Sequence, residues 1–169
     1  MEYDYYKVER VILMKEEMIM ESILGKCKLN HTCVITKDLE RLKKNYATLV
    51  GVEVPQTIVN KDYATMDTWF KGSPAPNTGL EQTAVVMDGG TIELIMPNEG
   101  PSAWNDFLEE HGEGIHHFCF EVNDLVAVVE RCEANGIKKI QTGKFPGGHY
   151  AYVDGRDYCG AYLELLEMF

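Results

Sequence analysis

Basic residues are scarce in this sequence, and their scarcity limits what the protein can bind. Lys and Arg total 16 against 27 Asp and Glu, so the formal net charge is -11 over 169 residues. No local cluster of basic residues offsets that balance. A surface for nucleic acid or anionic lipid needs positive charge to pair with phosphate. We therefore expect no nucleic-acid partner and no membrane partner.

Paired cysteines and long apolar runs are also missing. The cysteines number 5 and show no CxxC spacing, so neither a disulfide framework nor a zinc ribbon is predicted. No apolar run reaches the roughly 18 residues that a membrane-spanning helix needs. The N-terminal residues are acidic where a signal peptide would be basic. A protein of the reducing cytoplasm is the expectation that follows.

The composition that remains, 45% hydrophobic and 25% charged, is typical of a globular chain with one core or two small fused modules. Residues 1–25 are expected to be an N-terminal extension outside these modules. Apolar residues recur there at roughly helical spacing, which favours a helix. We assign no chemistry to this extension.

A motif that begins at a histidine occurs twice in the rest of the chain. Segments 31–39 and 117–125 share His, Cys, Asp and Leu at the same offsets, 86 positions apart. Each segment predicts a strand that passes through Asp-Leu into a helix. The two units also end alike, because a Glu lies at the centre of both 91–95 and 162–166. Each unit therefore opens on a histidine and closes on a glutamate, as an internal repeat would.

Both units predict the same order of elements: strand, helix, strand, strand, strand. In the first unit the helix is expected between Asp38 and Gly51, the second strand over 52–59, and a long loop over 60–79. A hairpin follows over 83–87 and 91–96. The predicted boundaries are 26–100 for the first βαβββ module, 101–113 for a connector helix, and 114–169 for the second module.

The four repeated polar residues, His31, Glu93, His117 and Glu164, allow two interpretations. In one, the histidines are core residues satisfied by hydrogen bonds, and the glutamates face solvent. In the other, the halves pack about a pseudo-twofold axis and bring two imidazoles and two carboxylates together. Each Glu lies between two bulky apolar residues, where a buried carboxylate is costly unless it is paired or metal-bound. This favours a site for a divalent cation such as Zn, Ni, Co, Mn or Fe.

The repeat resembles the vicinal oxygen chelate superfamily. The resemblance rests on the His of His31-Thr32-Cys33-Val34 and of 117–120, and on the Glu of 92–94 and of 163–165. Members of this superfamily include lactoylglutathione lyase, methylmalonyl-CoA epimerase, extradiol dioxygenases and bleomycin-resistance proteins. The resemblance covers about residue 28 to the C-terminus. It implies an α+β fold in which two paired βαβββ modules form a cupped mixed sheet around a metal. The matched positions imply four metal ligands: His31, Glu93, His117 and Glu164.

Segments 114–118 and 162–167 look most like the epimerase and its relatives. This resemblance implies a metal-dependent isomerase, epimerase or lyase of the glyoxalase type, acting on a small α-oxygenated carbonyl compound or thioester. There a Lewis-acid metal stabilises an enolate while a carboxylate, here Glu164 or Glu93, moves the proton on carbon. Two alternatives stay open: an extradiol-type dioxygenase with a 2-His-1-carboxylate iron site, and a metal-free small-molecule binding protein. A homodimer is expected, because oligomers of this kind are usually twofold.

Neighbouring residues receive simpler predictions. Strand alternation places His116 on the face opposite His117, with a structural or supporting role. Cys33 and Cys119 are expected to be small core residues. Glu81 is a candidate general base, although a solvated loop position is favoured.

Overall fold

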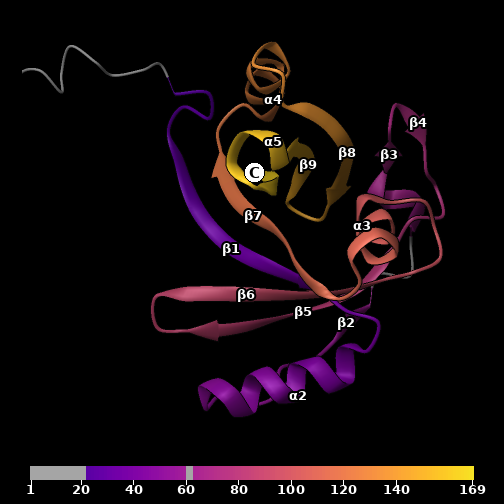
Figure 1. Ribbon diagram of the computed structural model, residues 1–169, viewed down its shortest axis with the longest axis vertical. Coiled ribbons are helices and arrows are strands. Elements are labelled where there is room, and N and C mark those ends of the chain that lie inside the picture. The colour runs from indigo at the N-terminus through magenta and orange to yellow at the C-terminus, as the bar shows by residue number, and fades with distance from the viewer. Residues whose placement is uncertain (1–21, 60–62) are drawn as a thin grey trace, which may run out of the picture.

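The computed structural model describes residues 22–59 and 63–169, and in this part of the chain it is an α+β protein built on one large mixed sheet (Figure 1). The strands are β1 (Cys27–Ile35), β2 (Ile58–Val59), β3 (Trp69–Phe70), β4 (Ser73–Pro74), β5 (Leu80–Met87), β6 (Gly90–Pro97), β7 (Gly114–Val122), β8 (Lys138–Phe145), β9 (Gly148–Gly155) and β10 (Ala161–Met168). The helices are α2 (Leu39–Val50), α3 (Ala103–His111), α4 (Leu125–Ala134), α5 (Arg156–Cys159) and the 3-10 helix η1 (Tyr63–Met66). Most of the extension predicted over 1–25 lies outside the described residues.

The strand order shows that the sheet consists of two related halves. The order is β2-β5-β6-β1-β7-β10-β9-β8-β3-β4. We call β1, α2, β2, β5 and β6 the first half, and β7, α4, β8, β9 and β10 the second half. Each half places its first strand parallel to its last, and β1 pairs antiparallel with β7 at the centre. The predicted βαβββ repeat is therefore present, and its two copies join within this chain.

The hydrogen-bonding register repeats as well. Cys33 of β1 is the partner of Glu93 on β6, and Cys119 of β7 is the partner of Glu164 on β10. A one-residue slip in either strand would turn every side chain to the other face of the sheet. The matching register therefore puts the histidine two residues before each cysteine, and the glutamate opposite that cysteine, on the same face in both halves.

The main helices begin where the sequence predicts. Asp38 accepts a hydrogen bond from the Arg41 amide at 2.9 Å, and Asp124 accepts one from the Ala127 amide at 3.2 Å. Such side chains satisfy amides that have no partner in the first turn of a helix. Helix α2 ends at Gly51, whose φ of 75° is the left-handed conformation that glycine adopts without strain. These caps fix the length of the helices that cover the sheet.

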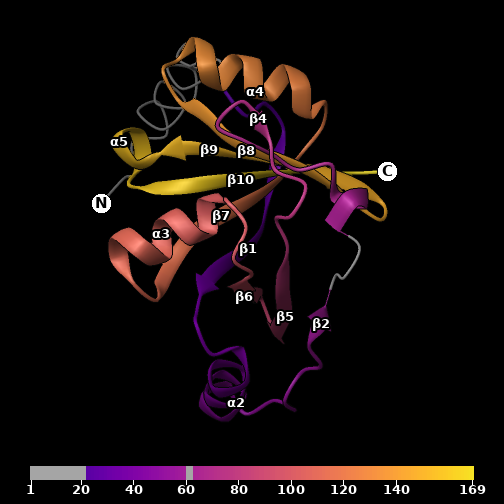
Figure 2. The ribbon, with the colours of Figure 1, turned by 90° about the vertical axis from the view of Figure 1, so that its right-hand side faces the viewer.

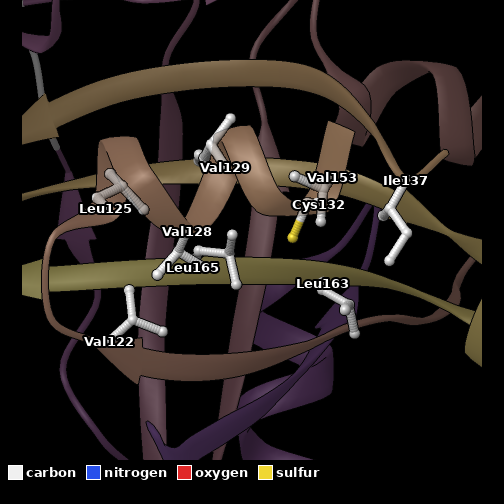
Figure 3. Close-up of a cluster of buried hydrophobic side chains, with 10 residues drawn as sticks. Val122, Leu125, Val128, Val129, Cys132, Ile137, Val153, Leu163 and Leu165 are labelled. Atoms are coloured by element: carbon white, nitrogen blue, oxygen red, sulfur yellow. The ribbon is translucent and has the colours of Figure 1, made fainter. Parts of the chain in front are cut away.

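Two apolar cores lie on the outer side of the sheet, one under each long helix. Helices α2 and α4 lie far apart at opposite ends of the molecule (Figure 1). Figure 3 shows Val128 and Cys132 of α4 above Leu163 and Leu165 of β10. In the first half, Leu39 of α2 belongs to a cluster that also contains Val34, Val85 and Leu94. Burial of such side chains contributes about 1.5–3 kcal/mol each, and it holds each helix to its own half.

A third core fills part of the concave side. Trp104 and Phe107 of α3 pack there with three tyrosines of the second half: Tyr150, Tyr152 and Tyr162. Figure 2 shows α3 beside β7 and β10, on the side of the sheet away from α4. The same cluster contains Ile35, Leu80 and Ile95, so the predicted connector helix packs on the inner face against residues of both halves.

Two irregular stretches differ from the predictions. The strand predicted over 52–59 is wrong for most of its length, because only Ile58 and Val59 pair with β5. The long loop predicted over 60–79 contains η1, β3 and β4 instead. Strand β3 pairs with β8, so a first-half segment extends the sheet of the second half. Pairing between segments so distant in sequence leaves no local periodicity to detect.

Among the residues that the structure describes, no helix is both long and apolar enough to cross a membrane.

Candidate metal centre

Four adjacent strands at the centre of the sheet carry the residues predicted as metal ligands. His31 lies on β1, Glu93 on β6, His117 on β7 and Glu164 on β10. One ligand atom from each of them lies within 4.8 Å of the others. The pseudo-twofold axis between β1 and β7 explains the convergence, since it brings matching residues of the two halves to one place.

The separate distances describe a compact cluster. His31 Nε2 lies 3.2 Å from Glu93 Oε2 and 3.1 Å from Glu164 Oε2. His117 Nε2 lies 3.2 Å from Glu164 Oε2 and 3.8 Å from Glu93 Oε2. The two Nε2 atoms are 3.3 Å apart. Two imidazole nitrogens and two carboxylate oxygens thus face a shared centre.

This arrangement fits a divalent cation. Tetrahedral bonds of 2.0–2.1 Å would place neighbouring ligand atoms about 3.3 Å apart, which is close to most of the observed distances. Glu164 Oε2 is buried and has no hydrogen bond of regular geometry among the described residues, although both Nε2 atoms are near it. That is expected of donors whose lone pairs point at a common centre rather than at one another. Imidazole with carboxylate suits Zn, Ni, Co, Mn or Fe.

Burial and mutual contact determine the charge of these side chains. Burial alone would lower the pKa of His31, but the nearby Glu164 and Glu93 carboxylates outweigh it and raise the pKa to about 10. Burial would raise the pKa of Glu164, yet the adjacent His117 and His31 more than offset this and hold it below its ordinary value. A cation held by His31 would therefore have to displace a proton from it, because a ligating imidazole is neutral.

A β-bulge immediately precedes each of the two clustered histidines, His31 and His117. In the ladder between β1 and β7, the register shifts between Leu29 and His31, which leaves Asn30 as an extra residue. A second shift, between Cys33 and Val34, leaves His116 as the extra residue on β7. A bulge of this kind re-aims the side chains around it. Neither bulge has a signal in the alternation of the sequence.

The bulge makes one prediction wrong. His116 does not face away from His117: its Nδ1 lies 2.8 Å from the Nδ1 of His117, and both rings contact Tyr152. His116 is buried, and burial is the main reason why its pKa lies well below the ordinary value. Sequence reasoning also missed Asn30, whose Oδ1 lies 3.0 Å from His31 Nδ1.

The other neighbours follow their predictions more closely. Cys33 and Cys119 are fully buried, and burial is the largest cause of the raised pKa of both thiols. They behave as small core residues, as predicted. Glu81 is the register partner of Met96 and lies three residues before Ala84, the partner of Glu93. Because side chains alternate along a strand, the side chain of Glu81 points to the outer face. A role for Glu81 as base at this centre is therefore not supported. The predicted solvated loop position is also wrong, because Glu81 is half-buried within β5.

The inner surface differs between the halves. Tyr152 is the register partner of Glu164 and is buried. Ala84 is the partner of Glu93 and is exposed. The Glu93 side chain is correspondingly 18% exposed, compared with 8% for Glu164. The inner face beside Glu93 is therefore the more open of the two.

A hollow of about 420 Å³ lies elsewhere on the molecule, between α4, β8 and Trp69. Its lining includes Val126, Val129, Lys139 and Lys144, and none of the four clustered residues. The volume suits a small ligand, but the two imidazoles and two carboxylates that converge on one point lie at the centre of the sheet instead. We therefore place the candidate site at the four converging residues.

Residues 30–153 match the sequence pattern of the Glyoxalase/Bleomycin resistance protein/Dioxygenase superfamily. The chain belongs to this superfamily. The matched span contains His31, Glu93 and His117, and Glu164 follows it in the last strand. The resemblance noted in the sequence is thereby confirmed, and so is the α+β fold with a cupped mixed sheet.

Enzymes of the superfamily resemble this member along most of its length. An ethylmalonyl-CoA/methylmalonyl-CoA epimerase of Cereibacter sphaeroides is 27% identical over 148 residues, which cover 83% of this chain and 98% of the epimerase. A lactoylglutathione lyase of Schizosaccharomyces pombe is 29% identical over 136 residues, which cover 75% of this chain and 43% of the lyase. These two similar proteins are an epimerase and a lyase.

Solved structures share the fold of this superfamily member. Methylmalonyl-CoA epimerase from Mycobacterium tuberculosis superposes with a TM-score of 0.62 at 20% identity, covering 92% of this chain and 95% of that one. A variant of the Streptomyces coelicolor methylmalonyl-CoA epimerase, in complex with 2-nitronate-propionyl-CoA, gives a TM-score of 0.51 at 20% identity and covers 83% and 96%. At this identity the likeness concerns the fold.

Proposed function

We propose that this protein is a divalent-metal-dependent isomerase, epimerase or lyase that moves a proton at the carbon next to a carbonyl or thioester group. The observation that carries the proposal is the convergence of two imidazole nitrogens and two carboxylate oxygens within 4.8 Å. His31, Glu93, His117 and Glu164 would hold the cation. When bound, the cation would act as a Lewis acid on the substrate oxygen where negative charge develops.

Glu164 is the residue that we assign to proton transfer. Its side chain is 8% exposed, and the buried Tyr152 lies beside it on the neighbouring strand. Few waters then compete for the carboxylate, so a proton removed from carbon stays available for return. Glu93 is the second candidate, and its greater exposure suits a ligand that contacts the substrate. His31 and His117 orient the carboxylates from both sides.

The relatives support a substrate class. The Cereibacter sphaeroides relative is named for two CoA thioesters, and the yeast relative for a glutathione adduct. Both names describe compounds with a carbonyl group next to a carbon that carries a removable proton. We propose a substrate of that class, entering over the first half, where Ala84 and Val86 leave the inner face exposed.

Hydrogen–deuterium exchange at carbon tests this function. Metal-loaded protein is incubated in deuterium oxide with a panel of acyl-CoA thioesters and hemithioacetals, and NMR follows loss of the α-proton signal. We expect exchange that depends on added metal and is lost in Glu164→Gln. Glu109→Gln, at an exposed position of α3, is the matched control and should exchange at the wild-type rate.

An oxygen electrode distinguishes the main alternative in the same experiment. A dioxygenase would consume oxygen with a catechol and ferrous iron and would exchange no α-proton. A binding protein would do neither. Oxygen uptake without α-proton exchange would overturn the proposal. It would also be overturned by exchange that proceeds at the same rate without added metal and in Glu164→Gln. The predicted homodimer and cytoplasmic location stay predictions.

A further inference from the structure

The side chain just before each ligand histidine turns back to that histidine. In the first half, Asn30 Oδ1 lies 3.0 Å from His31 Nδ1. In the second half, His116 Nδ1 lies 2.8 Å from His117 Nδ1. Both side chains belong to the bulged residues of the β1–β7 ladder. The two halves thus use different residue types for one geometric feature, at positions that correspond under the repeat.

The hydrogen bond of Asn30 has a defined direction. Its Nδ2 donates to Glu121 Oε2 at 3.3 Å, and a carboxylate can only accept. The amide oxygen of Asn30 is therefore the atom that faces His31, and it accepts the hydrogen carried by Nδ1. A neutral imidazole with its hydrogen on Nδ1 presents a free lone pair on Nε2. That is the His31 atom that faces the shared centre.

The same requirement orients the second half. Two Nδ1 atoms can bond only when one carries a hydrogen and the other does not. His117 needs a free lone pair on Nε2 to ligate, so its Nδ1 donates and His116 Nδ1 accepts. Three aromatic rings, Phe107, Tyr152 and Tyr162, surround His116 with centroids 5.1, 5.5 and 4.8 Å away. The ring of His116 is thereby held in place as an acceptor.

We propose that Asn30 and His116 are positioning residues that select the Nδ1–H tautomer of His31 and His117 and so set the affinity of the centre for a divalent cation. Groups that orient metal-bound histidines in this way typically change metal affinity by 10–100-fold when they are replaced. The inference rests on the metal site of the proposed function. It concerns affinity and tautomer, and does not depend on which reaction follows.

Cobalt titration of matched variants tests it. His116→Phe keeps a ring among the aromatic neighbours but removes the hydrogen-bond acceptor. In the other half, Asn30→Leu removes the acceptor and keeps a side chain of similar size. We expect the dissociation constant for Co²⁺ to rise by about 10–100-fold in each. His116→Asn supplies the kind of acceptor that the first half uses, and should recover part of the affinity lost in His116→Phe. His111→Phe, on the exposed end of α3, is the control and should bind like the wild type.

Two-bond ¹H–¹⁵N NMR of the histidine rings reads the tautomer directly in the Zn²⁺-loaded protein. In the wild type we expect His31 and His117 to carry hydrogen on Nδ1 and metal on Nε2. Circular dichroism first establishes that each variant is folded. Folded His116→Phe and Asn30→Leu that bind Co²⁺ within twofold of the wild type would overturn the inference, as would metal found on Nδ1. If these affinity losses appear but no α-proton exchange is observed, only the proposed reaction is overturned.

Discussion

The two halves share a chain path but differ in how firmly each holds its glutamate. Glu164 lies beside the buried Tyr152, whereas Glu93 lies beside the exposed Ala84. An internal repeat supplies two equivalent carboxylates, and the surroundings then make them unequal. Burial strongly changes the energy of a charged side chain, so two carboxylates at matching positions of a repeat can still differ in their chemistry. Under the proposed function, the half with the more buried glutamate would carry the proton transfer, and the more open half would admit the substrate.

The largest difference between the two halves should appear when one glutamate is replaced at a time. We expect Glu164→Gln to slow α-proton exchange by about 10²–10⁴-fold, the usual contribution of a positioned general base. Glu93→Gln should slow it much less, because an amide oxygen can still ligate and Glu93 is the more exposed of the two. Exchange rates are measured at saturating metal, with bound metal determined in parallel. Equal losses in the two variants would contradict the assignment of different roles.

The two outer cores allow the next comparison. Leu94 and Leu165 follow the two glutamates, and both are fully buried, in separate clusters. We expect Leu94→Ala and Leu165→Ala each to lower the free energy of unfolding by about 2–5 kcal/mol. The double variant should show the sum within about 0.5 kcal/mol, because the clusters share no residue. Urea denaturation measures all three. A clear departure from additivity would mean that the central strands couple the cores.

The smallest expected difference concerns the helix caps. Asp38→Ala should cost about 1 kcal/mol, since it removes the bond to the Arg41 amide. Asp124→Gly should cost only a few tenths, for two reasons. Asp124 has a φ of 56°, which glycine adopts more readily, and Glu167 also accepts hydrogen bonds from the amides of Asp124 and Leu125. Thermal unfolding compares the two, and a larger loss for Asp124→Gly would refute the stated role of Glu167.

The repeat made much of the fold predictable from the sequence. Matching offsets from His31 and His117 predicted the order of the elements, and the register of Cys33 with Glu93 and Cys119 with Glu164 bears that order out. The convergence of the four polar side chains followed from the same symmetry. Repetition helps because one assignment is tested twice by independent residues.

The features that the sequence did not reveal depend on single residues or distant pairing. One extra residue in a strand turns every following side chain to the other face of the sheet. It leaves no recognisable residue pattern in the sequence, so the bulges at Asn30 and His116 were missed. Strand β3 has only two residues, and its partner β8 lies about 70 positions later. Such contacts depend on tertiary structure rather than on local preference.

The ends of the large sheet have a consequence for assembly. Its outermost strands, β2 and β4, are each two residues long. Long free edges invite pairing with other chains, and very short edge strands remove that template. Strand β2 pairs with β5 only at Glu81 and Gln82, however, so beyond that point β5 has a sheet partner on one side alone, which is β6. Strand addition to this protein would therefore have to start at the uncovered part of β5 rather than at β2 or β4.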